Sequence, residues 1–189
     1  MSQQQIDIIQ LQHDVALSRD QQAYKMLFRY FHKPLIRFGT SIVKSKEAAE
    51  EIYSDIMLKM WDLGNALNNI DNLKTYLFIS VKNASLNYLA KYYKLKTQDI
   101  ESIDIELQHI ATPEEDLLTS ELQRNLSVAI KSLPTKAQLV YKLIKEDGFS
   151  YKQVAEILEI SVNTVEGHMT TALKKISTSL RNYLRSDRN

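Results

Sequence analysis

The chain has 189 residues, of which 44% are hydrophobic and 25% charged, and its formal net charge is +1. The absence of cysteine excludes disulfides, thiolate metal sites and cysteine nucleophiles, and the near-neutral total excludes a simple polycation. Four Gly and three Pro leave few helix breaks, so the composition favours an all-α protein with one large core or two small ones.

The N-terminal sequence predicts no export. The first residues, MSQQQIDIIQLQHDV, lack the basic flank and the apolar run of a signal peptide, and no later stretch reaches the length of a membrane span. The lack of cysteine agrees with a reducing compartment. We therefore expect a cytoplasmic protein without membrane insertion.

Charge is distributed unevenly along the chain. Residues 1–96 hold 13 Lys and Arg against 9 Asp and Glu, residues 97–121 hold none against 8, and residues 122–189 hold 11 against 6. Two mildly basic ends around an acidic middle indicate two modules that meet a polyanion, joined by a connector that avoids it. Chance clustering of charge on solvated surfaces is the alternative.

An amphipathic helix is predicted over residues 20–43. Its apolar residues follow the i, i+3, i+4 spacing of a helix that buries one stripe. They are Ala23, Met26, Leu27, Tyr30 and Phe31. Pro34 lies inside this segment and is expected to interrupt or kink the helix, because it lacks a backbone N–H donor.

A second helix is predicted from Ser45, a good N-cap, to about Gly64. It has one apolar row through Ala48, Ile52, Ile56 and Met60, and a second row through Tyr53, Met57 and Trp61. The second row either forms a partner-binding surface or packs inside the protein, if the helix is wedged between two neighbouring helices.

A turn-rich loop over residues 65–72, with four Asn, separates this helix from a long one over residues 73–96. The long helix has no acidic residue and interleaves aromatic with basic side chains: Tyr76, Phe78, Tyr88, Tyr92 and Tyr93 with Lys74, Lys82, Lys91, Lys94 and Lys96. Lysine attracts phosphate and aromatic rings stack on unpaired bases, so this mixture suits single-stranded or melted nucleic acid. The alternative is that several of these tyrosines belong to the core.

Residues 95–112 lack sustained periodicity and are predicted to be an acidic linker. A capping box at Thr112 and Glu115, with Pro113 between them, then starts a helix, and another helix starts at Pro134. The predicted organisation is two small helical domains, residues 1–94 and 113–189, joined by this linker.

The C-terminal domain contains two helices that meet at the short stretch EIS, residues 159–161. Ser150 and Gln153 form a capping box for the first helix, and Ser161 can cap the second. The residues expected to pack are Val154, Ala155, Leu158, Ile160, Val165, Met169, Ala172, Leu173 and Ile176. This is the pattern of a helix-turn-helix, in which the second helix presents its N-terminal residues to base edges. A generic helical corner has the same apolar spacing.

Three stretches make the chain similar to a known family, the extracytoplasmic-function (ECF) sigma factors of bacterial RNA polymerase. The family's promoter-binding module resembles SLPTKAQLVYKLIKEDGFSYKQVAEILEISVNTVEGHMTTALKKI. Its polymerase-binding helix resembles AAEEIYSDIMLKMW, and its helix for melting and reading the −10 element resembles YLFISVKNASLNYLAK. The similarity covers about residues 20–94 and 118–184.

The resemblance implies a sigma factor with no catalysis, cofactor or metal of its own, whose C-terminal domain is a winged-helix-like helix-turn-helix. Its partners would be promoter DNA, the clamp coiled coil and flap of core RNA polymerase, and an anti-sigma factor. The polymerase-binding residues would be Glu51, Ser54, Asp55, Met57 and Trp61. The residues for the −10 element, with base capture by the loop, would be Asn65, Asn68, Asn69, Asp71, Lys82, Asn83, Asn87, Lys91 and Lys94. The residues for the −35 element would be Ser161, Asn163, Thr164, Glu166, Gly167, His168, Thr171 and Lys174.

Four positions depart from the family pattern. Gln138 stands where Arg is common, Glu166 where a basic residue is common, Ser54 where Gln is common and Tyr76 where Trp is common. Glu166 can accept a hydrogen bond from cytosine but repels phosphate, so the −35 sequence is expected to be unusual or its binding weak.

Two other functions stay open on the residues alone. A stand-alone dimeric regulator would use only the C-terminal motif and would bind a palindromic operator. An enzyme is the other possibility, but the four histidines, at positions 13, 32, 109 and 168, lie far apart in sequence. No metal-ligand spacing, phosphate loop or nucleophile motif accompanies them.

Overall fold

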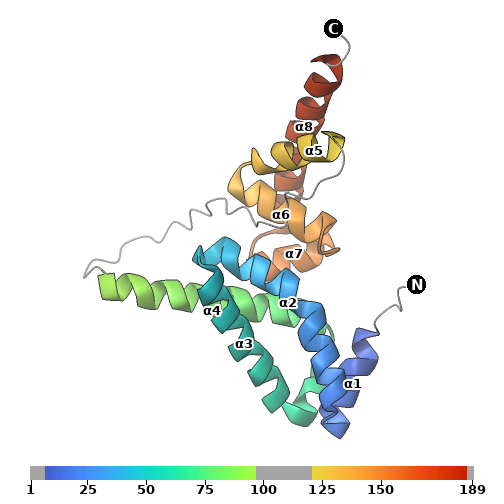
Figure 1. Ribbon diagram of the computed structural model, residues 1–189, viewed down its shortest axis with the longest axis vertical. Coiled ribbons are helices and arrows are strands. Elements are labelled where there is room, and N and C mark those ends of the chain that lie inside the picture. Colours follow the sequence, from blue (N-terminus) through green and yellow to red (C-terminus); the bar gives the residue numbers. More distant parts are fainter. Residues whose placement is uncertain (1–6, 97–120, 187–189) are drawn as a thin grey trace. The chain divides into compact units, whose positions relative to one another are not determined.

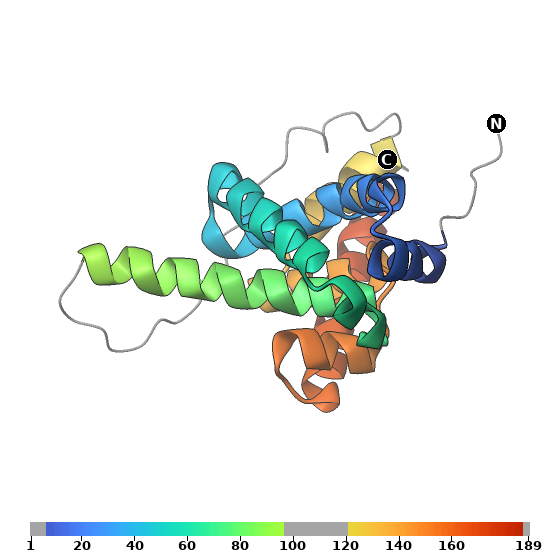
Figure 2. The same ribbon diagram turned by 90° about the horizontal axis from the view of Figure 1, so that it is seen from below.

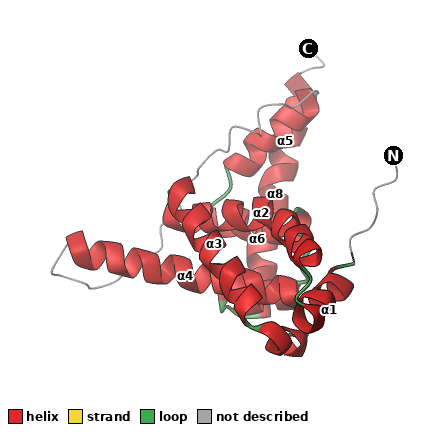
Figure 3. Cartoon of the chain, turned by 60° about the horizontal axis from the view of Figure 1, so that its bottom comes forward, coloured by secondary structure: helices red, strands yellow, loops and turns green. Residues whose placement is uncertain are grey.

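The computed structural model describes residues 7–96 and 121–186, and within these ranges every regular element is a helix (Figures 1 and 3). The chain divides into two compact units, residues 1–103 (unit 1) and 104–189 (unit 2). The expected all-α fold of two small helical bodies is confirmed. The expected linker, apart from residues 95 and 96, and the expected capping box at Thr112 lie outside the described residues, so the domain limits stay predictions.

Unit 1 is built around its second helix. It contains α1 (Ile8–Ser18), α2 (Gln21–Val43), α3 (Lys46–Asp62), the short 3-10 helix η1 (Gly64–Asn69) and α4 (Leu73–Lys96). α2 packs against α1, α3 and α4. Figure 2 shows α4, in green, along its full length. α2 continues through Pro34 as one helix, so this proline does not interrupt it. The buried residues Leu35, Ile36 and Phe38 follow the proline, and their packing offsets the hydrogen bond that it removes.

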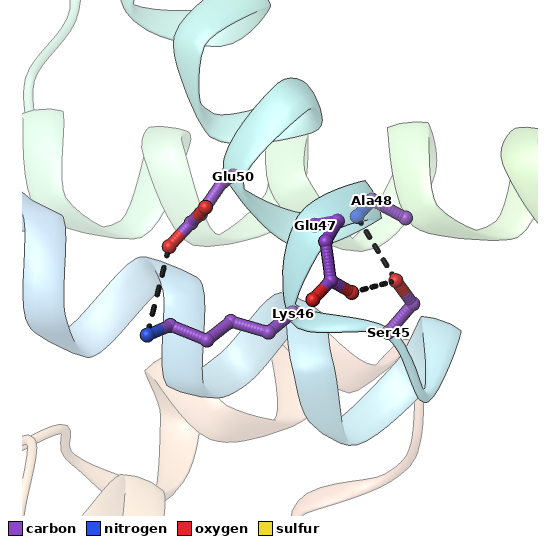
Figure 4. A network of polar contacts seen from close by, with 5 residues as sticks. All are labelled: Ser45, Lys46, Glu47, Ala48 and Glu50. Atoms are coloured by element: carbon purple, nitrogen blue, oxygen red, sulfur yellow. Dashed lines mark hydrogen bonds and ion pairs between the residues drawn. The ribbon is translucent and has the colours of Figure 1, made fainter.

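The helices of unit 1 start where polar side chains cap them. Asp7 and Asp20 accept backbone N–H groups at the starts of α1 and α2. At the start of α3, Ser45 Oγ accepts the Ala48 N–H at 3.1 Å and donates to the Glu47 carboxylate at 2.8 Å (Figure 4). Hydrogen bonds from its own backbone N–H and from Ser45 lower the pKa of Glu47. The N-cap predicted at Ser45 is therefore confirmed.

The core of unit 1 lies where α2, α3 and α4 meet. Its largest fully buried side chains come from all three helices: Leu27, Phe31, Leu35, Tyr53, Met57, Met60, Leu77 and Phe78. Gly39 allows a close approach, because a Cβ there would lie 3.3 Å from both Ala49 Cβ and Val81 Cγ1. The second apolar row of α3 is thus mostly internal, and α3 is a helix wedged between two neighbours.

Unit 2 is organised around its last helix. It contains α5 (Glu121–Lys131), α6 (Thr135–Lys145), α7 (Tyr151–Leu158) and α8 (Val162–Ser186), and α8 packs against the other three. Ser150 and Gln153 form the predicted capping box, with bonds of 2.9 and 3.3 Å. The described part of unit 2 contains no strand, so it is a helix-turn-helix without a wing.

Candidate functional site

The corner between α7 and α8 is closed by two local features. Glu159 adopts a left-handed backbone conformation, with φ of 55°, and ends α7. Ser161 Oγ accepts the Thr164 N–H at 3.0 Å and lies 2.8 Å from the Thr164 hydroxyl oxygen, so it caps α8 as predicted. The two helices therefore meet at the abrupt turn of a helix-turn-helix.

The N-terminal half of α8 has a buried face and an exposed face. Val165, Met169, Ala172 and Ile176 point into unit 2. Leu173 was expected to pack with them but is 46% exposed, because it lies one position beyond this inward row. The residues predicted to meet the −35 element are exposed, except that His168 is half-buried: Ser161, Asn163, Thr164, Glu166, Gly167, His168, Thr171 and Lys174.

Gly167 leaves a bare patch of backbone on the exposed face of α8. A Cβ built at Gly167 would meet nothing within 4 Å, so packing within the chain does not require a glycine there. Glycine in a helix interior costs about 1 kcal/mol relative to alanine. The backbone of α8 is therefore open to solvent between Glu166 and His168.

The loop between α3 and α4 combines one buried anchor with exposed polar side chains. Leu67 is fully buried, whereas Asn65, Asn68, Asn69 and Asp71 are all exposed. Part of the predicted loop is the 3-10 helix η1 and not irregular chain. The structure therefore presents the predicted base-capturing residues to solvent from a short, anchored segment.

A hollow of about 670 Å³ adjoins this loop. It is lined by the starts of α1 and α4 and by the end of the loop: Asp7, Ile8, Ile9, Gln12, Asp71, Asn72, Leu73 and Lys74. Asn72 Oδ1 accepts the Thr75 N–H at 2.9 Å and so caps α4. The Gln12 amide nitrogen donates to the carbonyl oxygens of Leu67 and Ile70, each at 2.8 Å.

α4 carries an exposed strip, which we define as Asn83, Asn87, Tyr88, Lys91 and Tyr92. The asparagines and the lysine follow i, i+4 spacing and share one face. The rings of Tyr88 and Tyr92 are nearly parallel, with centroids 6.4 Å apart and an interplanar angle of 9°. The α4 strip therefore joins amides, a positive charge and aromatic faces, the groups that suit unpaired bases and their phosphates.

Two predicted residues of α4 do not join this strip. Lys82 is only 6% exposed, which corrects the prediction, because helical periodicity places it on the inward side with Phe78 and Ser85. Lys94 lies in α4, but its side chain is outside the described residues.

The outward face of α3 differs by one residue from the prediction. Glu51, Ser54 and Asp55 are exposed, but Met57 is completely buried and cannot belong to a surface. Leu58 is 57% exposed and lies on the outward side with Glu51 and Asp55, because positions 51, 55 and 58 follow one side of the helix. We call these four residues, Glu51, Ser54, Asp55 and Leu58, the α3 face.

Trp61 lies half-buried near the end of α3 and is held by the corner between α1 and α2. The Arg19 guanidinium lies 4.2 Å from the centroid of the Trp61 ring, and Arg19 Nη1 donates to the Trp61 carbonyl. Tyr24 meets the same ring edge-on, with centroids 5.0 Å apart. Burial and the Asp62 carboxylate raise the pKa of Tyr24, so its hydroxyl stays protonated at neutral pH. Trp61 is therefore a surface group in a fixed orientation.

Sequence reasoning missed three residues that shape these surfaces: Leu58, Gln12 and Arg19. Leu58 had a signal in the sequence, since it lies seven positions after Glu51 on a predicted helix. Gln12 and Arg19 had none, because each acts on residues more than 40 positions away.

Two further searches of the described residues found little. No helix among them is both long enough and apolar enough to cross a membrane. Nor do three or more His, Asp or Glu residues come together there as a group that could hold a metal ion.

Comparison with protein families gives two matches, one in each unit. "Sigma-70 region 2" matches residues 27–94, and "Sigma-70, region 4" matches residues 123–176. The first range includes the α3 face, the loop and most of α4. The second range includes the whole corner between α7 and α8.

Curated relatives and solved structures agree with these matches. The ECF RNA polymerase sigma-E factor of Escherichia coli (strain K12) is 26% identical over 175 residues, covering 88% of this chain and 91% of that protein. The factor of the same name from Haemophilus influenzae is 24% identical over 170 residues, covering 86% and 89%.

Two solved structures share the fold. One is CnrH in complex with the cytosolic domain of CnrY, with a TM-score of 0.55, 19% identity and coverage of 93% of this chain and 99% of that one. The other is the sigma factor RpoE in complex with the anti-sigma factor NepR from Bartonella quintana, with a TM-score of 0.56, 23% identity and coverage of 84% and 96%.

Proposed function

The chain belongs to the sigma-70 family as an ECF-type RNA polymerase sigma factor, and we propose that its two units divide promoter recognition between them. A protein of this family directs promoter-specific initiation of transcription by RNA polymerase. Unit 2 binds the −35 element through α8, and unit 1 binds the polymerase and opens the −10 element. The observation that carries this proposal is the presence on one chain of an exposed polar recognition helix and of a separate, acid-free strip of Asn, Lys and Tyr.

In unit 2, the exposed face of α8 supports contact with the major groove. Small polar groups at its start, Ser161, Asn163 and Thr164, are the kind that reach base edges and phosphates. Glu166 repels phosphate but can accept a hydrogen bond from a cytosine amino group. We therefore propose a −35 site in which a cytosine lies opposite Glu166.

We expect Gly167→Ala to stabilise unit 2 and to weaken its binding to DNA. The added methyl group meets nothing within the chain and raises helix propensity by about 1 kcal/mol. The same methyl group lies where DNA approaches the backbone. Thermal unfolding and promoter binding by the holoenzyme check the two effects. Loss of stability, or unchanged binding, contradicts the close approach at Gly167.

In unit 1, the loop and the α4 strip support contact with unpaired bases. A base taken out of the stack costs a few kcal/mol, which contacts in the loop have to offset. The exposed side chains of Asn65, Asn68, Asn69 and Asp71 can hydrogen-bond to base edges. Tyr88 and Tyr92 present aromatic surface on which neighbouring bases can stack.

The α3 face supports binding to core polymerase. An exposed Leu58 beside Glu51 and Asp55 combines an apolar anchor with negative charge, which fits a partner surface with an apolar pocket and basic rim. Trp61, fixed by Arg19, extends this surface toward the loop. A stand-alone regulator would leave the α3 face and the α4 strip without a function.

We propose that the chain acts in the cytoplasm, contributes no catalytic group, and is controlled by an anti-sigma factor. Sigma factors regulate an enzyme and do not catalyse. The solved structure of RpoE contains the anti-sigma factor NepR, and that of CnrH contains the cytosolic domain of CnrY. We propose a partner of the same class for this chain.

Run-off transcription tests the proposed function. Core polymerase with this chain should transcribe from a defined set of promoters selected from a random library, whereas core polymerase alone should not. The free chain should bind the same DNA poorly. Specific footprints of the free chain on a palindrome, without any effect on transcription by the core enzyme, would establish the dimeric regulator instead.

A further inference from the structure

Gln12 is a buried polar side chain on the inner face of α1, which it shares with the buried Val15 and Ala16. Its neighbours Ile9 and His13 face solvent, but Gln12 is only 6% exposed. Both hydrogens of its amide are used, since the nitrogen donates to the carbonyls of Leu67 and Ile70 at 2.8 Å each. Leu67 lies 55 residues after Gln12 in the chain, so this buried amide connects α1 to a segment that is distant in the sequence.

The two carbonyls belong to the loop that we assign to base capture. Leu67 is its buried anchor, and the Ile70 N–H donates to the Leu67 carbonyl at 3.2 Å, which closes the last turn of η1. Gln12 therefore bridges both ends of the turn that carries Asn68 and Asn69. Asp71 follows directly and lines the hollow together with Gln12.

α1 supplies this bridge from outside the family match. The region 2 match begins at residue 27, whereas α1 ends at Ser18. α1 packs chiefly on η1 and α2, so holding the loop is one of its main contacts.

We propose that Gln12 is a positioning residue for promoter opening: through its amide, α1 holds the loop of residues 65–71 in the shape that accepts an unpaired base. This inference rests on the proposed function of that loop. Without the amide, the buried carbonyl of Leu67 and the part-buried carbonyl of Ile70 each lose a donor, and the turn carrying Asn68 and Asn69 loosens.

Gln12→Leu tests this role, because leucine fills a similar volume and cannot donate. Gln10→Leu is the matched control, since Gln10 lies on the exposed side of the same helix. In the free protein, we expect amide hydrogen exchange in residues 65–72 to become about tenfold faster in Gln12→Leu, with α2 and α3 unchanged. Unchanged exchange in the loop overturns the proposal. Should Gln12→Leu not fold, Gln12→Glu replaces it, because it keeps the shape and presents an oxygen to the carbonyls.

The second measurement is formation of the open promoter complex by the holoenzyme. The promoter position read by the loop is first located with the unsubstituted protein by scanning abasic nucleotides. On the intact promoter, Gln12→Leu should open DNA about tenfold less well than Gln10→Leu. On the promoter abasic at that position, the two variants should be equal, because the loop then has no base to hold.

An equal deficit on both promoters shows a general loss of structure and overturns the positioning role. No deficit on either promoter overturns it as well. If the unsubstituted protein forms no open complex with core polymerase, the proposed function fails, and the exchange measurement still decides whether Gln12 holds the loop.

Discussion

Leu58→Asp is expected to weaken binding to core polymerase by about thirtyfold or more while leaving unit 1 folded. Leu58 is exposed and lies at the C-terminal end of the α3 face, so its substitution removes no contact within the core. Covering a leucine side chain contributes about 2 kcal/mol to an interface, which is about thirtyfold in the dissociation constant. A carboxylate added beside Glu51 and Asp55 makes burial against a partner still less favourable.

The adjacent residue supplies the control. Met57→Ala should lower the free energy of unfolding by about 2–5 kcal/mol, because Met57 is completely buried between α3 and its neighbours. The folded fraction of Met57→Ala should bind core polymerase with the dissociation constant of the unsubstituted protein. Fluorescence titration of core polymerase and urea unfolding separate the two effects. If Leu58→Asp bound the polymerase normally, the α3 face would not be the binding surface.

Removing half of the predicted linker is expected to abolish transcription while both units stay folded. Residues 95 and 96 of the predicted linker belong to α4, and the remaining 16 residues, 97–112, span at most about 55 Å, so deletion of residues 99–107 removes about 30 Å of reach. This loss is close to one turn of duplex DNA, about 35 Å, and the resemblance implies promoter elements about two turns apart. With unit 1 on the −10 element, unit 2 would no longer reach the −35 element.

The control for this deletion replaces residues 99–107 with nine Gly and Ser residues. It keeps the length and removes the four acidic residues of that segment, so it separates reach from charge. Run-off transcription and the thermal unfolding of each unit are the measurements. Normal transcription from the shortened chain would contradict the role of the linker as a spacer.

Helical periodicity was enough to predict most of unit 2. The inward residues Val165, Met169, Ala172 and Ile176 and the caps at Ser150 and Ser161 were identified from spacing and residue type. Two predictions were off by one position: Leu173 is exposed, and Leu158 is half-buried while its neighbour Ile157 is fully buried. A stripe on a helix has an edge, and only packing determines where that edge lies. The exposed face of α8 followed directly from this stripe.

Unit 1 was harder to predict because α3 is apolar on more than one side. Spacing identified two apolar rows but could not say whether the second row is buried by neighbouring helices or is left for a partner. α3 packs against α2 and α4, and the rings of Phe28 and His32 on α2 lie against Tyr53, which spacing within α3 does not reveal. The same limit explains why Lys82 was placed on the surface although it packs inward.

The sequence by itself determined the all-α class, the starts of α2, α3, α6, α7 and α8, the helix-turn-helix and the family, because these depend on local spacing, capping residues and short motifs. It did not predict α1, which the tertiary structure shows over Ile8–Ser18. The tertiary structure alone decided that Leu58 and not Met57 is exposed, that Lys82 is covered, and that Gln12 holds the loop. The physical reason is that burial and hydrogen-bond partners depend on segments brought together by folding. Gln12 and Leu67 are 55 residues apart in the chain, and no periodicity in the sequence relates them.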